Sequence, residues 1–344
     1  MPQASDSFHI IRALNTIRNE LSSTRADAFL ISNLTNLQYF SGMKLSSGSM
    51  LVTRSSAALF VDDRYYDEAK TIASDHVMVK HARSFRASLK HSKRCCIESS
   101  LTLSAHKRLK QGYPKVQFIP TDNVCEQCRR TKSDIELQYI AQACAITKTI
   151  FTFVPEWLTQ KTTEIRLARK IRDKAEQLGA HDMAFDTIVA FGEHSSVPHH
   201  RPTERALQRG DVVQIDCGVK VSGYCSDFSR VFFTAPLTKE QRNAYSALTH
   251  TLQTCTQMVR PGVYARALDT RARTELKRFG FEHEFCHALG HGVGLDIHEG
   301  IILSHTTKRN NLSKLLKHEV ITIEPGLYFA GKWGMRIEDT IVVK

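Results

Sequence analysis

The segment DVVQIDCGVKVSGYCSDFSRVFF, residues 211–233, decides the fold of the second half of this chain. Its short apolar runs are rich in β-branched residues and are separated by glycine and polar residues, which predicts paired strands. Asp216 and Asp227 both lie in these apolar surroundings. A buried carboxylate is energetically costly unless it is paired or binds a cation. The segment therefore predicts a β-rich domain with two acidic side chains that need a partner.

Two later segments look like two more strands, each with an acid in the same apolar surroundings. EVITIEPGLYF (319–329) carries Glu324, and GMRIEDTIVV (334–343) carries Glu338. For any one acid, pairing with a nearby basic residue or a position at a strand end in water is the better explanation. For four acids together metal binding is simpler, because two divalent ions balance four carboxylates. Oxygen-rich coordination with one imidazole suits Mn(II), Co(II), Fe(II) or Zn(II) better than a thiolate site would.

The segment HALGHGVGLDIHEG (287–300) contains His287, His291 and His298. The first two are four residues apart, a spacing that places two ligands on one face of a helix. Glycine at every second position from 290 to 294 argues against a helix. We expect a loop or irregular strand, in which glycine permits close approach of the backbone to a ligand or to another strand.

The first part of the chain alternates strand-like and helix-like segments, which predicts an α/β layer. The strand-like segments are 27–32, 49–53, 57–62, 94–99 and 116–120, and the helix-like ones are 1–21 and 64–74. Helices are then predicted over 134–158, 163–180, 239–259 and 264–280. We place a domain boundary near residue 124, giving domains 1–124 and 125–344, and an α+β fold class overall.

The composition is that of a soluble globular protein, with 42% apolar and 24% charged residues among 344. The N-terminus resembles an amphipathic helix rather than a signal peptide, and no apolar stretch approaches the roughly 20 residues of a membrane span. These features predict a cytoplasmic protein without membrane contact. The net charge of +12 is spread along the chain, which favours a solvated basic surface over nucleic-acid binding.

Nine cysteines are an odd number scattered through a large chain, which is not typical of a disulfide framework. Cys125 and Cys128 form a single CxxC pair with no second ligand pair at zinc-site spacing. A metal or redox role for this pair is therefore disfavoured.

Six segments taken together resemble the pita-bread metallopeptidases, and within them aminopeptidase P and prolidase. Their order and spacing agree with that family over residues 125–344, and residues 8–124 resemble a creatinase-type N-terminal domain, notably in ADAFLISNLTNLQYFSG and ALFVDDRYYDEA. The six segments are TIVAFGEHSSVPHH, GDVVQIDCG, GYCSDFSR, HALGHGVGLDIHEG, ITIEPGLY and RIEDT. The resemblance implies a creatinase-type α/β domain followed by a pita-bread catalytic domain.

The resemblance also implies a dinuclear metal site. In the family one aspartate and the last glutamate bridge both ions, and these positions match Asp227 and Glu338. Asp216 would serve one ion, while His291 and Glu324 serve the other. All five ligands are present, so the sequence predicts an intact site for two divalent ions. Mn(II) is the favoured metal, with Co(II), Zn(II) and Fe(II) as alternatives.

Further site residues follow from the same resemblance. His199 and His298 match histidines that contact substrate and stabilise the transition state, and His287 matches one that lines the pocket. His200 has no matching role and is interpreted as a structural residue. Arg336, which would share a strand face with the acid two residues later if the strand is regular, matches an arginine that orients carboxylates.

The implied reaction is hydrolysis of the Xaa-Pro bond by water activated between two metal ions. Glu324 would pass a proton from the water to the leaving amine, and His199 and His298 would hydrogen-bond the developing oxyanion. We favour an Xaa-Pro aminopeptidase acting on proline-containing peptides, with an Xaa-Pro dipeptidase (prolidase) as the alternative, and expect a homodimer. A metal-free module that binds a partner or nucleic acid is disfavoured, because such proteins typically lose several ligands.

Overall fold

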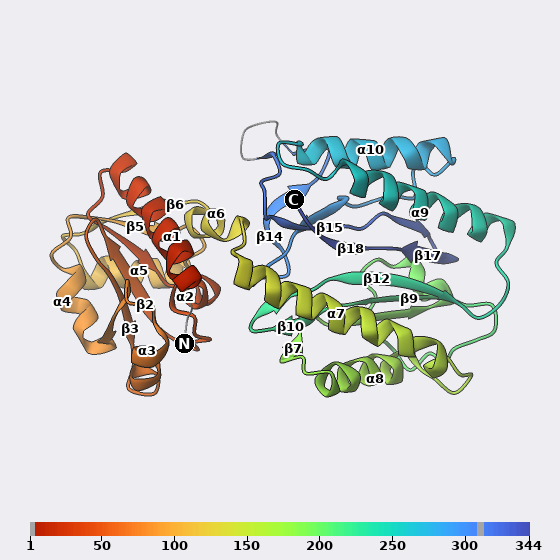
Figure 1. Cartoon of the computed structure of the whole chain (residues 1–344), viewed down its shortest axis with the longest axis horizontal. Helices are drawn as coiled ribbons and strands as arrows, with labels where there is room; N and C mark the ends of the chain where they lie inside the picture. Colours follow the sequence, from red (N-terminus) through yellow and green to blue (C-terminus); the bar gives the residue numbers. More distant parts are fainter. Residues whose placement is uncertain (1–3, 308–312) are drawn as a thin grey trace. The chain divides into compact units, whose positions relative to one another are not determined.

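The computed structural model describes residues 4–307 and 313–344, and the chain forms two compact units (Figure 1). The first unit comprises Met1–Arg129 and Ser133–Ile135, and the second comprises Arg130–Lys132 and Glu136–Lys344. Among the described residues, no helix combines the length and apolarity that a membrane crossing requires.

The first unit is built on a six-stranded mixed sheet in the order β4-β3-β2-β1-β5-β6. The strands are β1 (Ala28–Ile31), β2 (Ser49–Thr53), β3 (Ala57–Val61), β4 (Met78–His81), β5 (Arg94–Glu98) and β6 (Gln117–Thr121). β1 runs antiparallel to β2 and parallel to β5. Every residue of β1 and β3 is buried, so both faces of the sheet are covered. The α/β layer predicted from the sequence is confirmed.

Six α-helices belong to this part of the chain, and two of them match predicted segments. They are α1 (Ala4–Ser23), α2 (Leu34–Ser41), α3 (Tyr66–Ile72), α4 (Phe85–Leu89), α5 (Leu103–Gly112) and α6 (Val124–Arg130). The sequence pattern did not predict edge strand β4, because this strand has no buried residue and its two apolar residues are followed by lysine and histidine, without alternation. Cys125 and Cys128 lie on α6 with buried thiols, and burial raises the pKa of Cys128 to about 12.

The second unit contains α7 (Asp134–Trp157), α8 (Glu164–Gln177), α9 (Lys239–Met258) and α10 (Ala265–Arg278), all four of which were predicted. Figure 1 shows α7 and α8 along one side of this unit, α9 and α10 along the other, and the strands between them. The strands are β7 (Asp182–Met183), β8 (Ile188–Phe191), β9 (Val212–Cys217), β10 (Val219–Val221), β11 (Tyr224–Cys225), β12 (Phe228–Phe233), β13 (Gly290–Gly292), β14 (Glu299–Leu303), β15 (Val320–Ile323), β16 (Gly326–Phe329), β17 (Trp333–Arg336) and β18 (Asp339–Val342).

These strands form small antiparallel sheets in the orders β12-β9-β8, β11-β10-β7, β14-β13-β15-β18 and β16-β17. Two separate hydrophobic clusters support them. One joins α7 and α8 to β8, β9 and β12, and the other joins α9 and α10 to β15, β16 and β17. This packing of helices on antiparallel sheets is the α+β architecture expected from the sequence.

Each of the two C-terminal segments that were expected to form one strand forms two. The first breaks at Glu324 and Pro325, after which β15 pairs with β18 while β16 pairs with β17. The second breaks at Ile337 and Glu338. Pro325 lacks the N–H that a continuous ladder would need. Arg336 and Glu338 would share a strand face only on a regular strand. The break at Ile337 and Glu338 means that this condition is not met.

Gly290 and Gly292 belong to an irregular strand, one of the two forms expected for this segment. β13 pairs with β14 through a register shift between His291 and Gly292. A Cβ atom on Gly290 would collide with the carbonyl oxygen of Thr322, and one on Gly292 with that of Glu299. Glycine is thus required here because neighbouring backbones approach too closely for a side chain.

Candidate metal centre

Asp216 and Asp227 come together because β9 and β12 are paired. The antiparallel register places Asp216 opposite Ser229. Side chains alternate along a strand, so Asp227, two residues before Ser229, faces the same side as Asp216. Both carboxylates are buried, with 7% and 5% of the respective residue exposed. The paired strands predicted from residues 211–233 thus bring both acids to one location.

Glu324 and Glu338 lie at the two strand breaks described above, where the backbone leaves regular pairing. Glu338 is 1% exposed, and its Oε2 accepts a hydrogen bond from Ser229 Oγ at 3.0 Å. Its backbone N–H donates to the carbonyl oxygen of Ser229 at 3.1 Å. The Glu324 side chain is the more accessible of the two and is 17% exposed. Both breaks therefore direct a carboxylate toward the face that carries Asp216 and Asp227.

His291 completes the group from β13. Its Nδ1–H donates to the Gly292 carbonyl oxygen at 3.0 Å, which leaves the lone pair on Nε2. Nε2 lies 3.5 Å from Asp227 Oδ2 and 3.6 Å from Glu324 Oε1. Both separations are too long for good hydrogen bonds. An electron pair that faces carboxylate oxygens across this gap leaves a position that a cation could occupy.

Unpaired buried oxygens provide an independent test of whether a metal fits. Among the described residues, Asp216 Oδ1, Asp227 Oδ1 and Glu338 Oε1 are buried without any hydrogen-bond partner. Buried polar atoms are normally satisfied, and a buried acceptor without a partner costs about 1–3 kcal/mol or more. One ligand atom each from Asp227, His291 and Glu338 lies within 4.8 Å of the others. The donor set and its unused oxygens fit divalent cations.

The titration behaviour of the group agrees with this conclusion. Burial and the neighbouring carboxylate of Glu338 hold the pKa of Asp227 well above its usual range, and burial likewise raises the pKa of Glu338. Burial raises the pKa of Glu324 to about 8. Burial lowers the pKa of His291 to about 4, so this imidazole is neutral near pH 7 and its nitrogen is available. Without a counter-charge the acids repel one another, and divalent cations remove that repulsion.

Arg336 connects the acids on different strands. Its Nη2 donates to Asp216 Oδ2 at 2.6 Å, and its Nε donates to Ser229 Oγ at 2.9 Å. The second of these contacts reaches Glu338 through the shared Ser229 hydroxyl. The guanidinium thus contacts Asp216 directly, and its orienting role remains a prediction.

Tyr328 is a site residue that the sequence motifs did not reveal. Its hydroxyl accepts from Arg336 Nη1 at 2.7 Å and lies 3.1 Å from His287 Nε2. His287 Nδ1–H donates to the Ala288 carbonyl oxygen, so Nε2 accepts the Tyr328 proton. A Cβ on Gly326 would lie 2.6 Å from the Tyr328 hydroxyl. The Pro-Gly-x-Tyr spacing is the sequence feature that could have indicated Tyr328, because the glycine leaves room for the phenol ring.

The remaining predicted histidines gather near this group. The rings of His291 and His298 meet edge to face, with centroids 4.1 Å apart. Burial and then the charge of His199 lower the pKa of His298, and His199 also acts on the pKa of His287. His199 and His298 are exposed, while His287 is half-buried. Two imidazoles are thus open to an incoming molecule beside the buried carboxylates.

His200 hydrogen-bonds to a buried carboxylate. Its Nε2–H donates to Glu164 Oε2 at 2.9 Å, on the opposite carboxylate oxygen from the one that binds His194. This hydrogen bond lies outside the group of four carboxylates and one imidazole described above.

Comparison with known proteins identifies the family. Residues 138–344 match the model of metallopeptidase family M24, and residues 14–131 match the creatinase/prolidase N-terminal domain. The chain is 34% identical over 319 residues to a protein named Xaa-Pro dipeptidase from Pyrococcus horikoshii, covering 92% of this chain and 90% of that one.

Solved structures agree with the sequence comparison. The fold superposes on a prolidase from Pyrococcus horikoshii OT3 with a TM-score of 0.91 and 32% identity, covering 97% and 95% of the two chains. An X-Pro aminopeptidase from Thermotoga maritima gives a TM-score of 0.83 and 32% identity, with 93% of each chain covered. The M24 match covers more than half of the chain and the creatinase/prolidase match most of the rest. The chain is therefore a member of metallopeptidase family M24, with a creatinase/prolidase N-terminal domain before a pita-bread domain that uses divalent metal ions.

Proposed function

We propose that this metallo-exopeptidase is an Xaa-Pro dipeptidase, which cleaves the bond before proline in dipeptides. The sequence alone favoured the Xaa-Pro aminopeptidase and kept the dipeptidase as the alternative. The relatives at 34% and 32% identity named Xaa-Pro dipeptidase support the alternative better. The observation that carries the hydrolytic assignment is the convergence of Asp227, His291 and Glu338 with their unpartnered buried oxygens.

Two divalent ions would be held by five residues, with Mn(II) favoured over Co(II), Zn(II) and Fe(II). The five are Asp216, Asp227, His291, Glu324 and Glu338. Asp227 and Glu338 are the most buried of the four carboxylates that would hold the ions, and each has an unused buried oxygen. When bound, such ions lower the pKa of a water molecule and polarise the scissile carbonyl.

The chain's own residues would do the remaining work. Glu324 would accept a proton at a carboxylate oxygen and pass it to the leaving amine, because its side chain is more exposed than those of Asp216 and Asp227. His199 and His298, both exposed, would hydrogen-bond the substrate carbonyl as charge develops on it. Arg336 would hold Asp216 in place, and His287 would line the pocket through its bond to Tyr328.

Peptide length is the experimental test of the substrate. The purified protein would be incubated with Xaa-Pro dipeptides and with matched Xaa-Pro-Xaa tripeptides, with Mn(II), Co(II) and Zn(II) supplied separately. We expect turnover of the dipeptides and little of the tripeptides, with the highest rate in Mn(II). Preferential cleavage of tripeptides would instead establish the aminopeptidase.

Asp227→Ala is the matched control for the metal centre. Removing this buried carboxylate should abolish both metal content and hydrolysis. Turnover by this variant in metal-free buffer would contradict the site assignment independently of the peptide preference.

A homodimer in the cytoplasm that does not bind nucleic acid is the proposed cellular form. Light scattering at several protein concentrations tests the dimer, and a gel-shift series with DNA and RNA at low salt tests whether the net charge of +12 has a role.

A further inference from the structure

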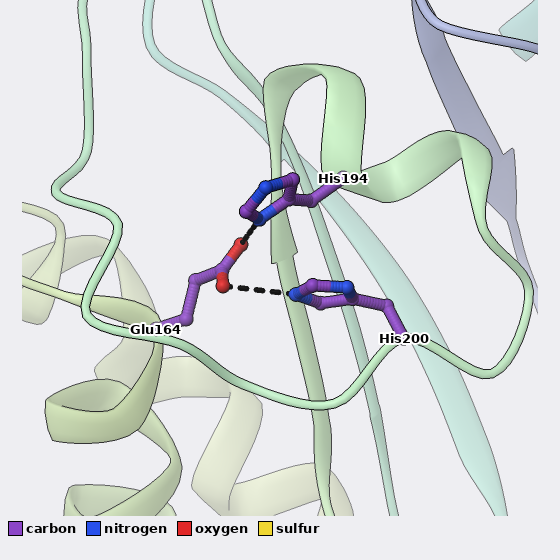
Figure 2. Close-up of side chains that lie close together, drawn as sticks. All are labelled: Glu164, His194 and His200. Carbon is purple, nitrogen blue, oxygen red and sulfur yellow. Dashed lines mark hydrogen bonds and ion pairs between the residues drawn. The ribbon is translucent and has the colours of Figure 1, made fainter.

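We propose that Glu164, His194 and His200 form a second transition-metal site, which binds Zn²⁺ and shares no residue with the five-residue centre. The three side chains come from separate parts of the second unit (Figure 2). Glu164 is the first residue of α8, His194 lies on a short 3₁₀-helix (Gly192–Ser196), and His200 lies in the loop after it. The three ligand atoms lie within 4.8 Å of one another.

Two imidazoles converge on one buried carboxylate. His194 Nδ1 lies 2.9 Å from Glu164 Oε1, and His200 Nε2 lies 2.9 Å from Glu164 Oε2. The ring centroids are 4.5 Å apart. Figure 2 shows both rings turned toward the same carboxylate group from one side. A single carboxylate needs only one histidine as an ionic partner. The second imidazole nitrogen, also 2.9 Å from the carboxylate, completes a set of three ligands, two imidazoles and one carboxylate.

The carboxylate is held in place by groups that a metal would not displace. The backbone N–H of Phe191 donates to Oε1 at 2.8 Å. Thr203 donates to Oε2 from its backbone N–H at 2.9 Å and from its hydroxyl at 2.7 Å. Metal-binding carboxylates are typically fixed by outer hydrogen bonds of this kind. These contacts would keep the Glu164 ligand oriented when a cation replaces the two imidazole protons that now point at it.

Access and ligand chemistry select the cation. The Glu164 side chain is fully buried, while His194 and His200 are 30% and 11% exposed. An ion can therefore enter from the His194 side, where water would complete a tetrahedral shell. Two nitrogens and one oxygen suit Zn²⁺, which imposes no d-electron geometry and accepts three protein ligands plus water.

Occupancy would fix the segment that carries His199. Within this segment, the hydroxyl of Ser195 accepts from the N–H of Gly334 at 2.9 Å, and the carbonyl of Pro198 accepts from Arg336 Nη1 at 3.3 Å. Zn²⁺ bound to His194 and His200 would tie both ends of the segment to α8. The consequence for substrate binding by His199 rests on the proposed function, whereas the metal site itself does not.

Zn²⁺ counting on the full-length chain tests the proposal. An Asp227→Asn/Glu338→Gln background would weaken the five-residue centre, and equilibrium dialysis with metal analysis would count bound Zn²⁺. Adding His194→Asn and His200→Asn to that background should remove one equivalent per chain. An unchanged Zn²⁺ content after both histidines are replaced would overturn the proposal, as would a background that binds none. Circular dichroism checks that each variant is folded.

Two further variants keep the result specific. Thr203→Val retains all three ligands but deletes one hydrogen bond to Glu164, and should weaken Zn²⁺ binding by roughly tenfold or more. His250→Asn is the matched control, because His250 pairs with Glu275 without a second imidazole and should leave Zn²⁺ binding unchanged. In wild type, Zn²⁺ bound at this site should also slow amide exchange over residues 192–200. Unchanged exchange there at saturation would count against the site.

Discussion

The carboxylate of Asp227 is buried, and its Oδ1 has no hydrogen-bond partner among the described residues. Its Oδ2 faces the Nε2 lone pair of His291 across 3.5 Å. While Asp227 is ionised both contacts are unfavourable, so a bound positive charge should stabilise this part of the fold. At the scale of single residues, the candidate metal centre is therefore a group of local conflicts that divalent ions would resolve.

Metal-depleted protein should show a stability profile that reflects these raised pKa values. A carboxyl whose pKa rises from 4.5 unfolded to about 8 folded stabilises the protein below pH 4.5, and this contribution is lost as the pH rises toward 8. For Glu324 the loss is at most about 5 kcal/mol. Thermal unfolding with and without metal, measured from pH 5 to 8, should therefore diverge as pH increases. Parallel curves would contradict the repulsion described for these acids.

Replacing Tyr328 with phenylalanine should impair hydrolysis without removing metal. The change deletes the hydrogen bonds to Arg336 and His287 but keeps the ring. A hydrogen bond to a charged group contributes about 1.5–3 kcal/mol, so kcat/KM should fall roughly 10- to 100-fold. Tyr245→Phe is the control, because that partly exposed ring packs edge to face on Phe233 and phenylalanine keeps this contact. Equal effects of both substitutions would exclude a positioning role for the Tyr328 hydroxyl.

At the scale of elements, the acidic ligand candidates divide into two kinds. Asp216 lies within a regular strand and Asp227 just before one, where alternation alone sets the facing side. Glu324 and Glu338 lie where expected long strands break and change sheets. The alternation of apolar and polar residues predicts the facing side of Asp216 and Asp227. The positions of Glu324 and Glu338 depend on pairing between distant segments, and the pattern within one strand carries no information about that pairing.

Gly290→Ala should destabilise the second unit. The new methyl group would collide with the Thr322 carbonyl, where strands β13 and β15 pair. Overpacking of this kind costs about 1–3 kcal/mol, and the displacement of His291 should also weaken metal binding. Gly112→Ala is the control, because nothing lies within 4 Å of the position that its new methyl group would occupy. Chemical denaturation and metal content would be measured for both, and an undisturbed Gly290→Ala protein would show that the strands can separate.

At the scale of the whole molecule, the chain has separate hydrophobic cores with different relations to the metal. The first unit packs its own cluster around β1, β3 and β5. The second unit has one cluster with α7 and α8 and another with α9 and α10. Asp216 lies in β9 and Asp227 just before β12, and both strands pack in the cluster with α7 and α8. Glu324 and Glu338 follow β15 and β17, which pack in the cluster with α9 and α10. Bound ions would therefore join two halves of one unit.

Chelation should loosen the second unit selectively. With metal removed, amide exchange should increase in β9, β12, β15 and β18, since bound ions would no longer connect the strands that carry the acids. The sheet of the first unit should exchange at the same rate in both states, because no proposed ligand belongs to it. Hydrogen–deuterium exchange resolved by peptide measures both units in one sample. Equal loss of protection in the two units would contradict a stabilising effect confined to the second.

The sequence by itself determined the family, the α+β class, the main helices and the paired strands that carry Asp216 and Asp227. These depend on local periodicity, on the positions of glycine and on the order of motifs, all of which can be read directly from the sequence. Only the tertiary structure decided the breaks at Glu324 and Glu338, the Tyr328–Arg336 contact, and the two histidines that converge on Glu164. Each of these depends on which distant segments lie side by side, and that is set by packing between elements rather than by the pattern within any one of them.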